Sequence, residues 1–236
     1  MKKQIIIIVL IIFFIPSIGL SQNKRKKKKK ISSIEQTRIT SIKQINNLHN
    51  GVLLVRLKTK KMSISALKEI GKNELAHKVE IKQSNLNKEI ISAFRDNFDF
   101  CPVFFFYSDY SQNIRDKQFD KVVFLNDNLL SDNISTFDNR NFFTAEFGII
   151  EQDTSKYYES YYYEKENSNY ERHSKYYGGT NMGFGALIIK SNQFIQLRRP
   201  FPYYVRTFDS FPIKRKKSKV VRKMNQRLHK FYNLNH

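Results

Sequence analysis

The sequence predicts an α/β fold: a mainly parallel sheet with helical crossovers, a C-terminal β-hairpin and a basic C-terminal helix. Two runs predict the sheet, Val52 to Leu57 and Val103 to Tyr107, because almost every residue in them is apolar or aromatic. A strand without a polar face is normally covered on both sides, as inner parallel strands are. The residues between the runs have helical periodicity, which favours a right-handed crossover. We expect Val103–Tyr107 to be the central strand.

The beginning of the chain predicts a secretory signal peptide over residues 1–21. Two lysines precede an apolar run from Ile5 to Leu20, and Gly19-Leu20-Ser21 supplies a cleavage site of small residues. Cysteine is absent near this site, so a lipid anchor is not expected. The predicted location is the periplasm or the cell envelope.

An uncleaved membrane anchor is the alternative. Residues 24–30 place seven cations directly after the apolar run, and the positive-inside rule would hold them in the cytoplasm. The run is shorter than the roughly 20 residues of a spanning helix, and Pro16 interrupts it. In this alternative the chain is an inner-membrane protein with a cytoplasmic body. Residues 22–33 are predicted to be a basic disordered linker and residues 34–236 a single α/β domain.

Three helices are expected before the central strand. The first spans Ile34 to Leu48 and ends at Asn50-Gly51, where glycine would take the left-handed conformation. A short helix capped by Ser63 is broken by Gly71. A longer helix then runs from about Asn73 to Phe98, with apolar residues on one face. That face is expected to contain Leu75, Val79, Leu86, Ile90 and Phe94.

Two further strands are expected after the central strand. Lys121–Asn126 is predicted to be a third strand of the same buried kind. Phe143–Ile149 alternates apolar with polar residues, which is typical of a half-exposed strand toward a sheet edge, and an antiparallel direction is open.

The last third of the chain changes character. Eight of the thirteen tyrosines lie in residues 153–177, which we interpret as a mobile insertion or a loose hairpin. Phe184–Lys190 and Gln193–Leu197 are predicted to pair as the C-terminal hairpin around Ser191-Asn192. Ser218 is expected to cap a final helix with the apolar stripe Val220, Met224, Leu228 and Phe231.

Positive charge is concentrated at the two ends of the chain. The formal charge of +21 falls to +19 without Lys2 and Lys3, and residues 198–230 contain twelve cations against one acid, Asp209. Such ends suggest contact with an anionic envelope surface or with lipid headgroups. If the chain is exported, nucleic acid is not an expected partner, and no small-molecule ligand is predicted. The candidate anion-contact residues are Arg198, Arg199, Arg206, Lys219, Arg222 and Lys223.

Both C-terminal features also have a structural interpretation. The cations and rings of residues 198–206 can stack on and pair with an anion, or they can belong to an extended segment with its rings buried. The basic final helix can lie on an anionic membrane, or its stripe can dock on the domain.

Catalytic and metal motifs are weak. The apolar neighbours of Cys101 disfavour a thiolate, the five histidines have no zinc-ligand spacing, and G-x-S-x-G is absent. The glycine-rich residues 178–185 lead into a strand rather than a helix, so they do not predict a phosphate loop. Asp109 and Asp127 follow predicted strands and would be the acid/base candidates at the rim of a parallel sheet. No metal, cofactor or catalytic residue is predicted.

Three stretches resemble an exported bacterial protein family without an assigned function. They are GVLLVRLKT, NFDFCPVFFFYSD and GALIIKSNQFIQLRRPFPYYVRTF. The resemblance implies an envelope address and carries no catalytic residue. The sequence therefore favours a non-enzymatic envelope protein whose basic ends contact anionic surfaces. The alternatives are an enzyme with its site at the sheet rim, and a membrane-anchored protein whose cytoplasmic body binds nucleic acid.

Overall fold

The computed structural model describes residues 32–132, 141–151, 157–163, 170–176, 183–208 and 214–235. From Ser33 onward the helices and strands belong to one compact unit. The predicted signal peptide and most of the predicted basic linker lie outside the described residues. Among the helices that are described, none combines the length and the apolar character that a membrane span requires.

Within the described residues, seven strands form one sheet in the order β4-β3-β2-β1-β5-β8-β9. Only the pairs that β1 forms with β2 and with β5 are parallel, while the other pairs in this sheet are antiparallel. The fold is α/β as predicted, but the sheet is mixed rather than mainly parallel. The strands are β1 (Val52–Leu57), β2 (Val103–Tyr107), β3 (Phe124–Leu125), β4 (Ser131–Asp132), β5 (Phe142–Ile149), β8 (Gly185–Lys190) and β9 (Tyr204–Arg206).

The two apolar runs that predicted the sheet are inner strands. β1 occupies the middle of the sheet, with β2 beside it. Phe105 and Phe106 of β2 are fully buried on opposite faces, in two separate apolar clusters. The prediction that Val103–Tyr107 is a strand covered on both sides is confirmed, although the central position belongs to β1.

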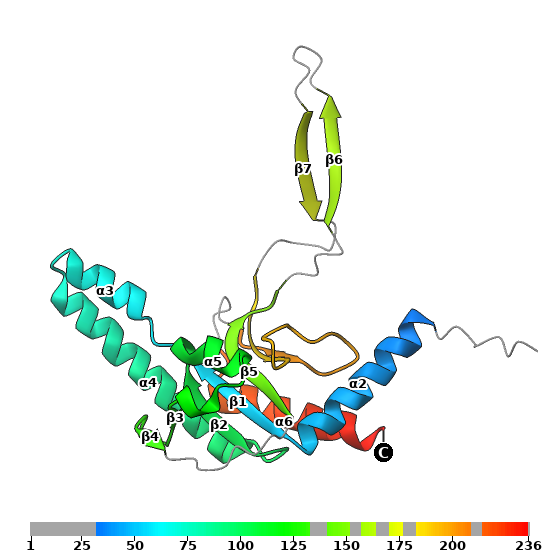
Figure 1. Ribbon diagram of the computed structural model, residues 1–236, viewed down its shortest axis with the longest axis horizontal. Helices are drawn as coiled ribbons and strands as arrows, with labels where there is room; N and C mark the ends of the chain where they lie inside the picture. Colours follow the sequence, from blue (N-terminus) through cyan, green and yellow to red (C-terminus); the bar gives the residue numbers. More distant parts are fainter. Residues whose placement is uncertain are drawn as a thin grey trace, which may run out of the picture. The chain divides into compact units, whose positions relative to one another are not determined.

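Three long helices contribute to the larger apolar cluster, on one face of the sheet (Figure 1). They are α2 (Ser33–His49), α4 (Asn73–Asn97) and α6 (Lys217–Asn233). In α6, Val220, Met224 and Leu228 are fully buried, so the predicted stripe docks on the domain. The helix begins at Lys217 without a side-chain cap, which corrects the prediction that Ser218 caps it.

Short helical segments contribute to the smaller cluster on the other face. Ile114 and Phe119 pack there against β1, β2 and β5 residues. The segments are η1 (Ser108–Tyr110), α5 (Ser111–Arg115) and η2 (Phe119–Lys121).

The first half of α4 packs on α3 (Lys61–Glu69) instead of on the sheet, and the two helices lie side by side (Figure 1). Gly71 between them has φ of 75°, as the predicted helix break requires. The short helix begins at Lys61, and its N-cap is Lys60 rather than Ser63. Leu75 is exposed, so the predicted apolar face of α4 holds only in its second half, where Ile90 and Phe94 are buried.

Gly51 ends α2 for a different reason from the one predicted. Its φ is not in the left-handed region, and a Cβ atom there would lie 2.1 Å from the carbonyl oxygen of Asn141. Glycine is therefore required by the close approach of the chain that enters β5. The amide of Val52 donates to that same Asn141 oxygen at 3.0 Å.

The strands after β2 differ from prediction in direction and place. β3 is only two residues long and runs antiparallel to β2, and the first residue of the predicted strand, Lys121, belongs to η2. β5 is an inner strand between β1 and β8, not an edge strand. The polar residues that suggested an exposed face, Thr144 and Glu146, instead contact other polar groups on the sheet.

The predicted C-terminal hairpin has the wrong second strand. β8 pairs with β9, and residues 193–197 contribute only an isolated bridge between Lys190 and Gln196. Ser191 closes a tight turn, because its carbonyl oxygen accepts from Phe194 N and its hydroxyl from Ile195 N. Phe194 has φ of 61°, which interrupts a regular strand.

The tyrosine-rich segment contains a second, two-stranded antiparallel sheet. It consists of β6 (Tyr157–Tyr163) and β7 (Tyr170–Tyr176), with Tyr157 opposite Tyr176 and Tyr163 opposite Tyr170. Of the two predicted interpretations of this segment, the hairpin is the one that the described strands support.

Candidate functional site: a basic pocket beside β9 and α6

A pocket of about 430 Å³ lies beside β9 and the middle of α6. Its lining contains five cationic side chains and no carboxylate among the described residues. The cations come from three consecutive segments of the chain: the stretch through β9, the residues before α6, and α6 itself. They are Arg199, Arg206, Arg215, Lys223 and Arg227.

Two of these arginines are held by the free edge of β9. Tyr203 O accepts from Ile189 N and Thr207 N donates to Gly185 O, so residues 203 and 207 face β8. The alternate carbonyl groups, of Tyr204 and Arg206, therefore point away from the sheet. Arg227 Nη1 donates to the carbonyl oxygen of Tyr204 at 2.8 Å, and Arg215 Nη1 donates to that of Arg206 at 2.9 Å.

Aromatic side chains contact the other two arginines, Arg199 and Arg206, and also Arg215. Arg199 Nη2 donates to the Tyr204 hydroxyl oxygen at 3.1 Å. The Arg206 guanidinium lies 4.2 Å from the ring centroid of Phe184, and that of Arg215 lies 4.3 Å from the centroid of Phe208. Such contacts restrict a guanidinium while leaving its N–H groups at the ring edge available for an anion.

Of the two interpretations of segment 198–206, the structure supports the buried extended segment for Phe201, and anion binding by its cations stays a prediction. Phe201 and Val205 are fully buried in the larger cluster, while Arg199 and Arg206 remain exposed. Buried rings hold the segment to the sheet, and its cations face the pocket.

The predicted anion-contact residues divide into two groups. Arg199, Arg206 and Lys223 line the pocket, whereas Arg198, Lys219 and Arg222 do not. The Arg222 Nε group donates to Asn97 Oδ1 at 3.0 Å, so this side chain links α6 to the end of α4.

Sequence reasoning missed two pocket residues, Arg215 and Arg227. Arg227 lies one helical turn after Lys223, and this i,i+4 spacing could have placed both on one side of the helix. Arg215 is the only arginine in the run 214–217, but the sequence does not indicate which of these cations lies in a pocket. One of them, Lys217, is buried with its ammonium 4.3 Å from the Phe147 ring centroid, and it does not line the pocket.

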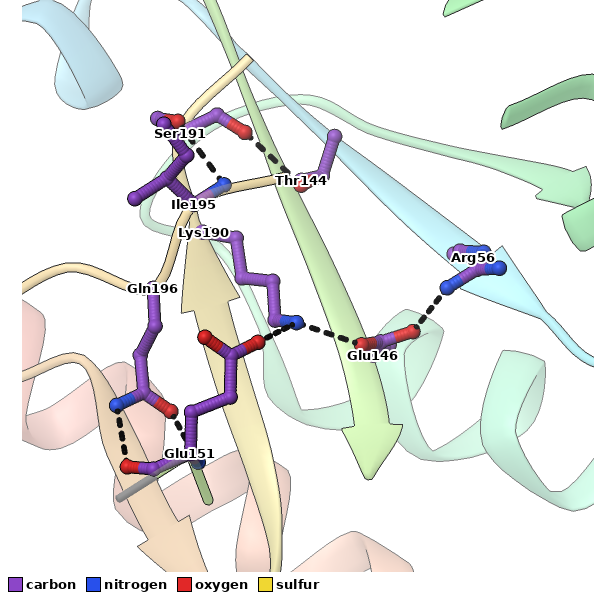
Figure 2. Close-up of polar contacts among 8 residues, drawn as sticks. All are labelled: Arg56, Thr144, Glu146, Glu151, Lys190, Ser191, Ile195 and Gln196. Atoms are coloured by element: carbon purple, nitrogen blue, oxygen red, sulfur yellow. Dashed lines mark hydrogen bonds and ion pairs between the residues drawn. The ribbon is translucent and has the colours of Figure 1, made fainter. Parts of the chain in front are cut away.

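A second group of charges lies on strands β1, β5 and β8 and on the segment directly after β5, and here acids and bases alternate. Figure 2 shows the Glu146 carboxylate between Arg56 of β1 and Lys190 of β8. The Arg56 Nη1–Glu146 Oε2 distance is 2.8 Å and the Lys190 Nζ–Glu146 Oε1 distance is 3.1 Å. Lys190 also contacts Glu151 at 2.7 Å, which extends the chain to four residues. We call these four residues the charge network.

The charge network shifts the pKa values of its buried members. Burial alone would raise the pKa of the Glu146 carboxyl, but Lys190 and Arg56 outweigh it and hold this pKa below its ordinary value. Burial would lower the pKa of Lys190, but Glu151 and Glu146 raise it above the ordinary value of 10.5. Both groups therefore remain charged at neutral pH.

The two acid/base candidates do not meet. Asp109 follows the C-terminal end of β2, where Thr59 Oγ1 donates to its carboxylate at 2.8 Å and Lys61 forms an ion pair with it. Asp127 follows β3, which runs antiparallel to β2, so it lies toward the other end of the sheet and pairs with Arg95. The prediction that both aspartates share one rim is wrong, because it assumed a parallel β3.

The remaining candidate groups, Cys101 and the histidines of the described residues, do not line the pocket. Cys101 is buried, and burial raises its pKa to about 12, which keeps the thiol protonated. Among the described residues, no three His, Cys, Asp or Glu side chains gather where they could hold a metal ion. His229 Nε2 contacts Asp99 Oδ1 at 2.7 Å, and the His49 ring stacks on Tyr232.

Comparison of the chain with family models, with curated proteins and with solved structures found no match.

Proposed function

We propose that this chain is a non-enzymatic protein of the cell envelope that binds anionic groups through its C-terminal basic region. The observation that carries the proposal is the pocket, where five cations from separate segments converge without a carboxylate in the described lining. Like charges repel, so such a cluster is most stable when an anion joins it. The charge network shows a different arrangement in the same chain, because both of its cations, Arg56 and Lys190, have an acidic partner.

The envelope address rests on the predicted signal peptide and on the resemblance of three stretches to exported bacterial proteins. Mass measurement of the mature N-terminus tests it. Gln22 as the first residue supports export, while an intact Met1 on a protein with a cytoplasmic body would overturn this part of the proposal.

Sedimentation with lipid vesicles tests anion binding. We expect the protein to bind vesicles that contain phosphatidylglycerol or phosphatidic acid at low salt, and to be released as salt screens the charges. Vesicles of phosphatidylcholine alone are the matched neutral control. Absence of binding at low salt, or binding that salt does not affect, would contradict the proposal.

The enzyme alternative has lost its pair of carboxylates, because Asp109 and Asp127 lie toward different ends of the sheet. If Asp109 were nevertheless catalytic, Asp109→Ala would remove an activity while leaving stability unchanged. We expect only the loss of its contacts with Thr59 and Lys61.

A further inference from the structure

We infer that the pocket beside β9 and α6 binds a phosphate monoester or a diphosphate, that is, a compact group with two or more negative charges. This inference rests on the proposed function and names the ligand class of the same site. The inference goes beyond general attraction to an anionic surface, because it assigns selectivity for this ligand class to five side chains.

The charge of the site indicates the charge of the ligand. The lining contains five cations and no carboxylate among the described residues. A phosphodiester has one charge and would leave most of these cations uncompensated. A monoester at neutral pH has a charge between about −1.5 and −2, and a diphosphate has more, so each places more charge within the same volume.

The geometry of the arginines fits phosphate oxygens. Arg215 and Arg227 each use Nη1 to hold a carbonyl of β9, which fixes the guanidinium before any ligand arrives. A guanidinium has five N–H donors, so one bond to the main chain leaves several for a ligand. Planar guanidinium groups pair with two phosphate oxygens at once, and side chains that are already positioned lose less entropy on binding.

The size of the pocket adds a second requirement. Its volume of about 430 Å³ lies in the range of small-molecule sites, about 300 to 1,000 Å³. Phosphate alone does not fill this space, and Pro200, Pro202, Tyr203 and Tyr204 provide apolar surface beside the cations. The ligand therefore has its phosphate on a larger body, either a soluble compound or a lipid headgroup that projects from its membrane.

Two double variants with the same net charge separate the pocket from diffuse attraction. Arg206→Gln with Lys223→Gln removes one arginine and one lysine from the pocket lining. Arg198→Gln with Lys219→Gln removes one arginine and one lysine that are exposed and outside the lining. All four side chains are exposed, so both variants are expected to fold, which circular dichroism and thermal unfolding verify.

Titration calorimetry at constant ionic strength measures the binding of glucose 1-phosphate and of inorganic pyrophosphate, with glucose as the uncharged control. We expect the wild type and the Arg198/Lys219 variant to agree within threefold in Kd. The Arg206/Lys223 variant should bind at least tenfold more weakly. Equal weakening in both variants would overturn the inference, because it would show that net charge alone attracts the anion. Lys223→Gln alone replaces the double variant if the latter unfolds.

Vesicles distinguish the two sources of phosphate. Phosphatidic acid presents a monoester and phosphatidylglycerol a diester, and the two vesicle types are matched in surface charge. If the ligand is a lipid, the wild type should prefer vesicles with phosphatidic acid, and only the Arg206/Lys223 variant should lose this preference. Binding of the soluble phosphates without this preference supports a soluble ligand.

The remaining outcomes separate this inference from the proposed function. Equal binding to both vesicle types, with no binding of soluble phosphate, would overturn the inference and leave the proposed function standing. Binding of soluble phosphate without vesicle binding supports the inference and contradicts the anionic-surface role. Duplex DNA is the phosphodiester competitor. Tighter binding to it than to pyrophosphate, reduced equally in both variants, would overturn the inference in favour of nucleic-acid binding.

Discussion

The charge network and the basic pocket use cations in opposite ways. In the network, Lys190 lies between two glutamates and Arg56 pairs with one of them, and the Lys190 and Glu146 side chains are only 11% and 12% exposed. In the pocket, the described cations contact carbonyl groups, a hydroxyl and rings, and carboxylates are absent from the lining. Largely buried charge that is paired within the chain is already neutralised and costs stability when one partner is removed, whereas exposed charge without an acidic neighbour in the described lining is available to a partner. The following predictions test this distinction.

The largest effect is expected from Glu146→Gln. This change keeps the shape of the side chain but leaves Arg56 without a carboxylate and Lys190 with Glu151 alone. We expect a loss of about 2 kcal/mol in the free energy of unfolding, less than for a fully broken buried pair because Glu151 remains. Glu151→Gln is the control. We expect it to lose about 1 kcal/mol or less of unfolding free energy, because the Glu151 side chain is exposed. Equal losses of unfolding free energy in the two variants, measured by urea unfolding, would show that burial does not make the Glu146 carboxylate more important for stability than that of Glu151.

The network also predicts a pH dependence of stability. The pKa of Glu146 is below its ordinary value of 4.5 in the folded protein, so its contribution is complete above pH 4.5 and is lost as pH falls through the folded value. The pKa of Lys190 is above 10.5, so its contribution is complete below 10.5 and is lost as pH rises through the folded value. Unfolding free energies measured between pH 3 and 7 should fall less steeply in Glu146→Gln than in the wild type. Parallel curves would contradict this assignment.

An exposed link between α6 and the segment before β2 should contribute less. Asn225 Nδ2 donates to Asp99 Oδ1 at 2.7 Å, His229 contacts the same oxygen, and these contacts hold the pKa of Asp99 below its ordinary value. The Asp99 side chain is mostly exposed, so Asp99→Asn is expected to cost about 0.5 kcal/mol at neutral pH. The difference from the wild type should disappear as pH falls through the pKa of Asp99. Thermal unfolding at pH 7 and pH 3 measures both quantities.

The smallest effect, and the one of opposite sign, is expected from Lys223→Gln. Removing one cation from the pocket relieves repulsion, so stability should change by less than about 0.5 kcal/mol, toward greater stability. The gain should shrink as salt screens the remaining charges. A clear destabilisation would show that Lys223 has a structural role and would weaken the contrast with the network.

The sequence predicted the inner strands β1 and β2 from their apolar runs. It also predicted the three long helices, although in α4 the apolar pattern fits the burial only in the second half. It failed where a pattern has two physical explanations. Alternation in 143–149 suggested an edge strand facing solvent, but Thr144 donates to Ser191 O and Glu146 pairs with Arg56 and Lys190. These partners lie in distant segments, and alternation alone does not reveal them.

The sequence predicted only part of the candidate site. Composition located the cations of 198–230, and three of the six predicted anion-contact residues line the pocket. Arg215 and Arg227 were missed because their positions depend on which strand follows β8. If residues 193–197 pair with β8, as the sequence suggested, the outward carbonyl groups of Tyr204 and Arg206 are not expected. The two arginines that bind these carbonyl groups are then not expected either.

The arginines on β9 also affect how this protein can associate with others. An outer strand with vacant carbonyl groups is a template on which another chain can add a strand, the contact that starts domain swapping and fibre growth. Here Arg215 and Arg227 already occupy two outward acceptors, of Arg206 and Tyr204, and they surround that border with positive charge. An incoming strand would have to displace both guanidinium groups, so this border is protected against polymerisation by main-chain pairing.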